Sequence, residues 1–305
     1  MSKRIISVQL YAFGTIVLWA SAFVFTKIGL NYYSPETIGV IRYLIASIFF
    51  IVAGSIKRIG FPEIKDIPKI ILSGVLGFTI YMITFNQASL SLTSATGSIV
   101  IATAPVITAI LAFILFKEKI KTLGWVAIIV EFAGITVLTL GDGTFSVNSG
   151  ILWMIIAAIC ISGYNIFQRD FVKKYSAIQS TAYSVFAGTI CLLMYLPKAS
   201  VQIGSVSVHH LLVLCFLGIF PSALAYLWWA KALMMANKTS DVTNFMFVTP
   251  FLAALMGFYI MDEIPTISTC IGGLMIIAGL ILFKKANSQG GNNIDENSIS
   301  TDENV

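Results

Sequence analysis

The stretch Ala104-Pro105-Val106-Ile107-Thr108 opens an apolar run that ends at Lys117-Glu118-Lys119. The same pattern returns at Thr249-Pro250-Phe251-Leu252-Ala253 and ends at Asp262-Glu263-Ile264. In both copies the glutamate lies 13 positions after the proline, and a glycine lies 16 positions after the glutamate. Self-similarity at a fixed spacing is typical of an internal repeat. We therefore expect the chain to consist of two related halves.

The composition is that of a membrane protein. Hydrophobic residues make up 57% of the 305 positions and charged residues 11%, with a mean hydropathy of +0.90, whereas about a quarter of the residues of a soluble domain are charged. The apolar blocks are about 20 residues long, the length of helix that crosses about 30 Å of hydrocarbon. A backbone in lipid must satisfy its own hydrogen bonds, and the alternation of a barrel strand is missing, so we predict an all-α polytopic protein. The ten expected transmembrane helices are 8–30, 35–56, 68–89, 95–116, 123–140, 150–168, 178–196, 210–230, 240–260 and 266–283.

The lysines and arginines predict the orientation of these helices. With the N-terminus inside, 16 of the 19 basic residues fall on the cytoplasmic side. Lys27 and Lys198 fall outside, and Arg42 lies within the second helix. This asymmetry follows the positive-inside rule, and one missed helix would reverse the side of every later residue. We therefore expect a multi-pass protein of the plasma membrane with both termini in the cytoplasm.

An odd number of helices in each half predicts that the second half enters the membrane upside down. The expected repeats are 1–141 and 150–284, each of five helices, joined by a linker at 142–149. Residues 285–305 are polar and acidic and are expected to form a disordered cytoplasmic tail. Inverted repeats related by an axis in the membrane plane are a common transporter design, because they allow one chain to open to either side.

Proline residues mark two predicted kinks. Pro105 and Pro250 each lie near the middle of a span, where proline supplies no N–H and clashes with the carbonyl four residues earlier. A freed carbonyl in the bilayer needs protein or cavity water to satisfy it, so both kinks are candidate gating points that face a central cavity. The alternative is that they only bend helices for packing. Pro221 has no proline partner in the third span, where Gly77 and Phe78 lie at the matching depth, and predicts an asymmetric bend.

Ionisable residues at membrane depth are candidates for function, because each costs roughly 2.5–3.5 kcal/mol or more when it faces lipid. Arg42 and Glu131 lie at depths that differ by about 5 Å. They either pair with each other, the interpretation that we favour for Arg42, or Arg42 attracts an anionic group of a substrate. Glu131 is a candidate for proton coupling, because burial favours the protonated form of a carboxyl group. Lys27 is expected to extend to the membrane interface.

Polar and aromatic residues deep in the spans predict a lined cavity. Ser21 of the first span matches Ser162 of the sixth, and Phe23 matches Tyr164. The full set of candidates for the substrate cavity is Trp19, Ser21, Phe23, Arg42, Tyr81, Asn86, Ser162, Tyr164 and Asn165.

Several other kinds of site are not indicated. The four cysteines lie singly in different apolar blocks, and His209-His210 has no further ligand nearby, so no metal site is expected. Paired aspartates at membrane depth and a phosphate-binding loop are both missing, so neither an enzyme nor a bound cofactor is predicted. The basic residues occur singly or in small groups between the blocks, which argues against a nucleic-acid partner.

Four motifs together resemble a known family. They are Trp19-Ala20-Ser21-Ala22-Phe23, Pro35 with Arg42-Tyr43, Gln87-Ala88-Ser89-Leu90 and the doubled Pro-x12-Glu-x15-Gly. From about residue 8 to residue 284 the chain is similar to the EamA-type branch of the drug/metabolite transporter superfamily. It departs mildly at Ala20, where the family usually has glycine, and at Cys160, where the sixth span lacks the aromatic residue of the first. Glu131 lies outside the family pattern.

The resemblance implies a secondary transporter whose cavity is lined mainly by helices 1, 3, 4, 6, 8 and 9. Such proteins commonly export amino acids or related metabolites and drugs by alternating access. The expected partners are a small-molecule substrate and the lipid bilayer, with proton coupling open and the chain a monomer or homodimer. One alternative is uptake or exchange of an anionic metabolite, which needs several cations in the cavity. The other is a sensor or assembly subunit that does not transport, which needs a partner-binding domain. Substrate and direction stay open.

Overall fold

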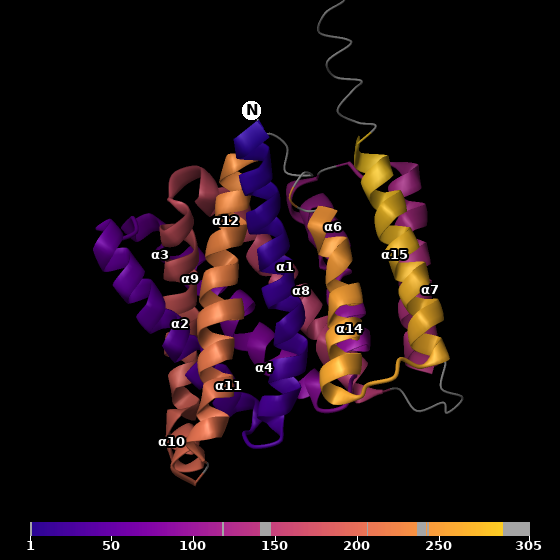
Figure 1. Ribbon diagram of the computed structural model, residues 1–305. Helices are drawn as coiled ribbons and strands as arrows, with labels where there is room; N and C mark the ends of the chain where they lie inside the picture. The colour runs from indigo at the N-terminus through magenta and orange to yellow at the C-terminus, as the bar shows by residue number, and fades with distance from the viewer. Residues whose placement is uncertain are drawn as a thin grey trace, which may run out of the picture.

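The protein is a bundle of helices packed side by side (Figure 1). The computed structural model describes residues 2–117, 119–140, 148–205, 207–236, 242 and 244–288, and within these ranges it contains helices and no strand. Eight helical units in these ranges are long and apolar enough to cross a membrane, whereas the helices Thr122–Leu138 and Thr249–Met261 are apolar but shorter. The predicted all-α membrane class is confirmed.

The first half contains two continuous helices, two interrupted ones and a final continuous helix. The continuous helices are α1 (Ser2–Leu30), α2 (Pro35–Lys57) and α7 (Thr122–Leu140). The third unit comprises η1 (Ile64–Asp66), α3 (Ile67–Gly74), the π-helical segment η2 (Val75–Ile80) and α4 (Tyr81–Ser89). The fourth unit comprises α5 (Ser94–Ile101) and α6 (Ala104–Phe116).

The second half repeats this plan. It begins with α8 (Ser149–Lys174), followed by α9 (Ala177–Leu192), η3 (Leu193–Tyr195) and α10 (Leu196–Ser205). The next unit comprises α11 (Val208–Ile219), the π-helical segment η4 (Phe220–Leu224) and α12 (Ala225–Met235). The last units are η5 (Asn244–Val248) with α14 (Thr249–Met261), and α15 (Ile267–Ser288).

The last helix is longer than its predicted span of 266–283, because Lys284 and Lys285 continue it to Ser288. Basic residues are favourable at a helix C-terminus, so the helix need not stop where the apolar block stops. The rest of the predicted tail, 289–305, and most of the predicted linker, 142–147, lie outside the described residues.

Both repeated prolines begin a helix instead of bending one. Pro105 and Pro250 stand in the first turn of two 13-residue helices, α6 and α14. Near Pro105 the span Ser94–Phe116 is interrupted, because α5 ends at Ile101, four residues before the proline, and α6 starts at Ala104. Each helix then ends at a left-handed residue 12 positions after its proline, Lys117 at φ 56° and Asp262 at φ 53°. The repeat in the sequence is therefore a repeat of backbone geometry.

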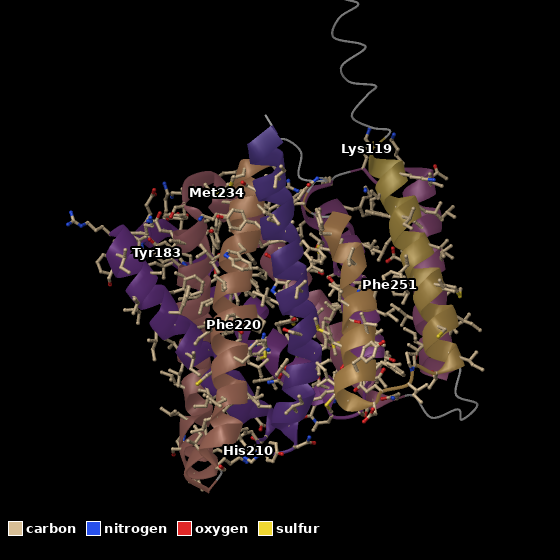
Figure 2. All side chains as sticks on the ribbon, viewed as in Figure 1. Lys119, Tyr183, His210, Phe220, Met234 and Phe251 are labelled. Carbon is tan, nitrogen blue, oxygen red and sulfur yellow. The ribbon has the colours of Figure 1, made fainter. Side chains whose placement is uncertain are left out.

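The two π-helical segments are a second matching feature. Val75 and Phe220 begin them, and these residues are 145 positions apart, the same separation as the two repeated prolines. The predicted asymmetric bend at Pro221 is therefore wrong, because the third unit has the same widened turn without a proline. Gly77 of this third unit is needed for close packing, because a Cβ on Gly77 would lie 2.6 Å from the Tyr164 ring. Figure 2 shows Phe220 about midway between His210 and Met234, so the widened turn lies at the middle of the bundle.

Helices of one half pack mainly against helices of the other. α1 contacts α12 and α14, α2 contacts α9 and α11, α4 contacts α8, and α7 contacts α15. Figure 1 shows α7 and α15 as a pair at one edge of the bundle. Glycines permit this close approach, since a Cβ on Gly134 would lie 2.8 Å from the Gly272 carbonyl oxygen.

Equivalent positions of the two repeats lie at opposite ends of the bundle. Lys119 lies at the end where α1 begins (Figure 2). Its counterpart in the second repeat, Ile264, follows Glu263, and Glu263 contacts Lys27 in the last turn of α1.

The outer surface is apolar, as a bilayer requires. Large side chains on α2, α7 and α15 are exposed, among them Ile48 at 61%, Ile129 at 67% and Leu274 at 67%. A soluble monomer rarely exposes so much contiguous apolar surface. This surface identifies the medium around the protein as lipid.

Candidate functional site

A group of aromatic rings occupies the middle of the bundle, where units of both halves meet. We call Trp19, Tyr43, Phe78, Tyr164 and Tyr226 the aromatic cluster. Phe78 is its centre, with ring centroids 5.2 Å from Tyr43, 5.0 Å from Tyr164 and 5.5 Å from Tyr226. Trp19 lies 5.4 Å from Tyr226. These tilted and edge-to-face arrangements are those that aromatic rings prefer.

Arg42 brings a positive charge to this cluster. Its side chain is 4% exposed, and its guanidinium lies 6.0 Å from the centroid of the Tyr43 ring. Nε donates to the Ser222 hydroxyl of η4, and Nη1 lies 3.7 Å from Sδ of Met82. The side chain therefore joins α2 of the first repeat to η4 of the second.

Glu131 lies elsewhere, in α7 against α15. It is 2% exposed, and within the described part of the chain neither carboxylate oxygen has a hydrogen-bond partner. The predicted pairing of Arg42 with Glu131 is therefore wrong. Equal depth along the membrane normal does not fix the position of a side chain within the membrane plane, which depends on helix packing.

The surroundings of Glu131 repeat those of an isoleucine. Glu131 packs against Gly279 of α15, and Ile276, 145 positions later, packs in the same way against Gly134 of α7. A Cβ on Gly134 would lie 2.8 Å from Cγ1 of Ile276. A carboxyl group thus occupies in the first repeat a position that is apolar in the second.

Two polar candidates hold irregular backbone in place. Ser162 donates to the carbonyl of Ala104 at 2.9 Å, beside the break between α5 and α6, and also to Ala158 at 2.6 Å. Asn86 donates from Nδ2 to the carbonyl of Pro35 at 2.8 Å, at the start of α2. Ser21, the counterpart of Ser162, bonds within its own helix to Leu18 at 2.8 Å.

The remaining candidates lie at different distances from the centre. Phe23 is buried, with its ring 5.0 Å from that of Phe85, and the half-buried Tyr81 lies 5.7 Å from the same ring. Asn165 is half-buried on α8. The two prolines do not share an environment, since Pro250 is buried and Pro105 is exposed. Their role in gating stays a prediction.

An ion pair that the sequence did not predict joins the repeats near the end of α1. The Lys27 ammonium donates to the Glu263 carboxylate and, at 2.9 Å, to the carbonyl of Leu92. The other oxygen of Glu263 accepts from the backbone N–H of Ser94 at 2.7 Å. Lys27 thus has a half-buried carboxylate partner just beyond the end of α14, and its extension to the membrane interface stays a prediction. Glu118, the counterpart of Glu263, lies outside the described residues.

The repeat spacing could have found one further member of the cluster. Tyr226 lies 145 positions after Tyr81, so aligning the halves on their prolines pairs the two tyrosines. Ser222 and Met82 give no comparable signal, because their role depends on the direction in which the Arg42 side chain points.

Comparison with known proteins identifies the family to which the chain belongs. The model of the EamA-like transporter family matches residues 6–140 and, a second time, residues 148–284. The chain belongs to the EamA-like transporter family. The doubled match agrees with the two halves that the proline, glutamate and glycine spacing predicts, and it confirms the resemblance found in the sequence.

Two relatives of this EamA protein match about nine-tenths of its length, and a third matches about two-thirds. The uncharacterized transporter YdfC of Bacillus subtilis (strain 168) is 31% identical over 281 residues, 92% of each chain. The "Probable terminal-alkyne amino-acid exporter" of Streptantibioticus cattleyicolor is 26% identical over 272 residues, 89% of this chain and 91% of its own. The S-adenosylmethionine uptake transporter of Rickettsia felis is 30% identical over 198 residues, 64% and 65% of the two chains. A crystal structure of a protein 19% identical in sequence superimposes with a TM-score of 0.62, covers 91% of this chain and 96% of its own, and supports the fold alone.

Proposed function

We propose that this EamA-family protein is a secondary active transporter that exports amino acids or related small metabolites across the plasma membrane by alternating access. The observation that carries the proposal is the aromatic cluster with Arg42, because it lies where helices of both repeats meet. A site between two halves can be exposed to either side when the halves change places. The amino-acid exporter of Streptantibioticus cattleyicolor supports the substrate class and the direction.

The proposal includes a topology. All ten apolar helices cross the bilayer, in two inverted repeats at 1–141 and 150–284, with linker 142–149 and a tail from 285 in the cytoplasm. The opposite placement of Lys119 and Glu263 in the bundle supports the inversion. Labelling of single cysteines at positions 118 and 263 with an impermeant reagent should place them on opposite sides, and labelling from the same side would refute the topology.

The proposal also assigns roles to particular residues. The substrate cavity includes the candidates of α1, α2, α4 and α8 described above, Pro105 and Pro250 start the two helices that move, and Glu131 carries the coupled proton. Glu131 is distant from the aromatic cluster, so it acts through the α7–α15 pair and not by touching the substrate. The transporter works as a monomer or homodimer.

The test is counterflow in liposomes. Purified protein is reconstituted, the vesicles are loaded with one unlabelled compound from a panel of amino acids, purines and cationic drugs, and uptake of a labelled trace of it is measured. We expect transient accumulation of at least one amino acid, and none in protein-free vesicles. The variant Gly204→Ala is a control for handling, because an added Cβ there meets nothing within 4 Å. Binding without movement of any compound would refute transport and favour a sensor.

Uptake is the second candidate function. The S-adenosylmethionine uptake transporter of Rickettsia felis, a relative over 64% of the chain, supports it. The direction is decided in whole cells, where export predicts that overproduction lowers the intracellular level of the transported compound and uptake predicts that it raises that level.

A further inference from the structure

Arg42 is a buried cation with no anion beside it in the part of the chain that the structure describes. Its side chain is 4% exposed, and no carboxylate of the described residues lies within 4.0 Å of its guanidinium nitrogens. Arginine does not lose its proton in proteins, and a buried charge without a counter-charge is strongly destabilising. The site therefore carries a buried positive charge that a bound anion would stabilise.

The present neighbours of the guanidinium satisfy it only in part. Nε donates to the Ser222 hydroxyl, and Nη1 has only the Met82 sulfur, a weak acceptor. Nη2 has no hydrogen-bond partner among the described residues. The two terminal nitrogens thus form an edge that can take a planar, two-oxygen acceptor, the geometry in which arginine binds a carboxylate.

The acidic residues that the structure describes do not fill this place. They lie elsewhere: Glu263 pairs with Lys27, Glu36 with Lys198, Glu63 and Asp66 with Lys174, and Asp170 with Lys173, while Asp262 is exposed and Glu131 is enclosed between α7 and α15. No described carboxylate is therefore available to Arg42, and an anion from outside the chain can take this place.

The aromatic rings near Arg42 indicate which groups the bound anion carries besides its negative charge. Trp19, Tyr81 and Tyr226 are half-buried, so each ring keeps some surface that the protein does not cover. Aromatic faces bind apolar groups and cations, and they offer nothing to a second negative charge. One cation among rings suits a monoanion better than a phosphate dianion.

We propose that Arg42 binds the carboxylate of the transported molecule and that the aromatic cluster packs against its apolar portion. The substrate class is then a monocarboxylate with an apolar or aromatic group, such as an apolar amino acid. This inference rests on the proposed transport function. Because Arg42 reaches from α2 to Ser222 of η4, the bound carboxylate lies at the seam that alternating access must open.

The test compares ligands that differ only at the carboxylate. L-Phenylalanine, L-phenylalaninamide and phenethylamine are titrated against the purified protein, with quenching of tryptophan fluorescence and the shift in unfolding temperature as readouts. A charge-assisted hydrogen bond predicts that L-phenylalanine binds roughly tenfold to a hundredfold more tightly than the amide. Equal binding of the acid and the amide by the wild type would overturn the proposal.

Variants separate a ligand contact from a structural role. Arg42→Gln should remove the preference for the acid while leaving the weak binding of the amide, and Arg42→Lys should keep part of it. Ser222→Ala, the matched control, leaves the charge in place and should keep the preference. If Arg42→Gln lowers binding of all three ligands equally, or Ser222→Ala does what Arg42→Gln does, the role is structural. If Arg42→Gln does not fold, the ratio of the affinities for L-phenylalanine and its amide, measured in the wild type and in Ser222→Ala, still decides whether the carboxylate is recognised.

Binding and transport fail separately in this design. Counterflow that moves nothing, together with a clear preference for the acid in binding, refutes the transport function and retains the carboxylate site. Counterflow of amino acids and their amides at equal rates refutes the carboxylate site and retains transport.

Discussion

The Lys27 ammonium, in the last turn of α1, donates a hydrogen bond to the Glu263 carboxylate just beyond α14, so that one ion pair joins the two repeats. Its side chains are 21% and 10% exposed, and Ser94 and Leu92 supply two further hydrogen bonds. Removing one partner of a partly buried pair leaves the other charge uncompensated, which costs more than breaking a surface pair. It holds α1, α14 and the start of α5 together at this end of the bundle.

Removal of Lys27 should therefore loosen this end. In Lys27→Met the Glu263 carboxylate loses its counter-ion, and we expect the buried Cys160 to react about tenfold faster with an impermeant maleimide, equivalent to about 1.4 kcal/mol. The measurement uses a background in which the other cysteines, Cys191, Cys215 and Cys270, are replaced by serine. Lys198→Met is the control, because it breaks the more exposed pair with Glu36. Equal labelling rates in the two variants would contradict the proposed role of the Lys27–Glu263 ion pair in holding this end of the bundle together.

The sequence was sufficient for the architecture and insufficient for the contacts. The proline and glutamate spacing predicted the two repeats because backbone features, such as the left-handed ends at Lys117 and Asp262, recur with the residues that make them. The widened turns were missed because Pro221 marks only the second of them, and the first has no proline. A single chain gives no sign that two unlike residues share one role.

Side-chain partners were the least predictable part of the site. Arg42 and Glu131 have similar depth, but α2 and α7 have different neighbours, and only the packing decides which groups meet. Lys27 was expected to extend to the interface, but the sequence did not indicate that Glu263 would be its partner. Such partners are far apart in the sequence and leave no local pattern.

Close packing of α3 against α9 gives a stability prediction. A Cβ on Gly74 would lie 2.5 Å from the carbonyl oxygen of Ser184, a backbone atom that cannot rotate away. We expect Gly74→Ala to destabilise the protein by about 1–3 kcal/mol, the usual cost of overpacking, with a lower unfolding temperature in detergent. Gly204→Ala, which meets nothing within 4 Å, should leave it unchanged. If both variants unfold alike, the two helices are not in the contact described.

The local stability of the bundle around Glu63 should depend on pH. Hydrogen bonds from Lys174, at 2.7 Å, and from Lys65 hold the pKa of the Glu63 carboxyl below its ordinary value of 4.5. A carboxyl with a lowered folded-state pKa contributes stability above its ordinary pKa and loses it as the pH falls through the lowered value. The hydrogen-exchange protection factors of residues 59–66, which are corrected for the intrinsic pH dependence of exchange, should therefore fall below about pH 4.5. Lys174→Met should weaken this dependence, whereas Lys198→Met should not.

Glu131 gives the prediction that bears most directly on energy coupling. Because Ile276 fills the equivalent position in the second repeat, isoleucine fits the packing against the facing glycine, and Glu131→Ile removes two unpartnered oxygens. We expect it to raise the free energy of unfolding by about 1–3 kcal/mol, whereas Ile276→Glu should lower it. If Glu131 carries the coupled proton, both Glu131→Ile and Glu131→Gln should retain counterflow, which needs no gradient, and lose the acceleration of transport by a pH gradient. An unchanged response to the gradient in Glu131→Gln would remove the residue from the coupling mechanism, while the stability comparison would still report on its packing.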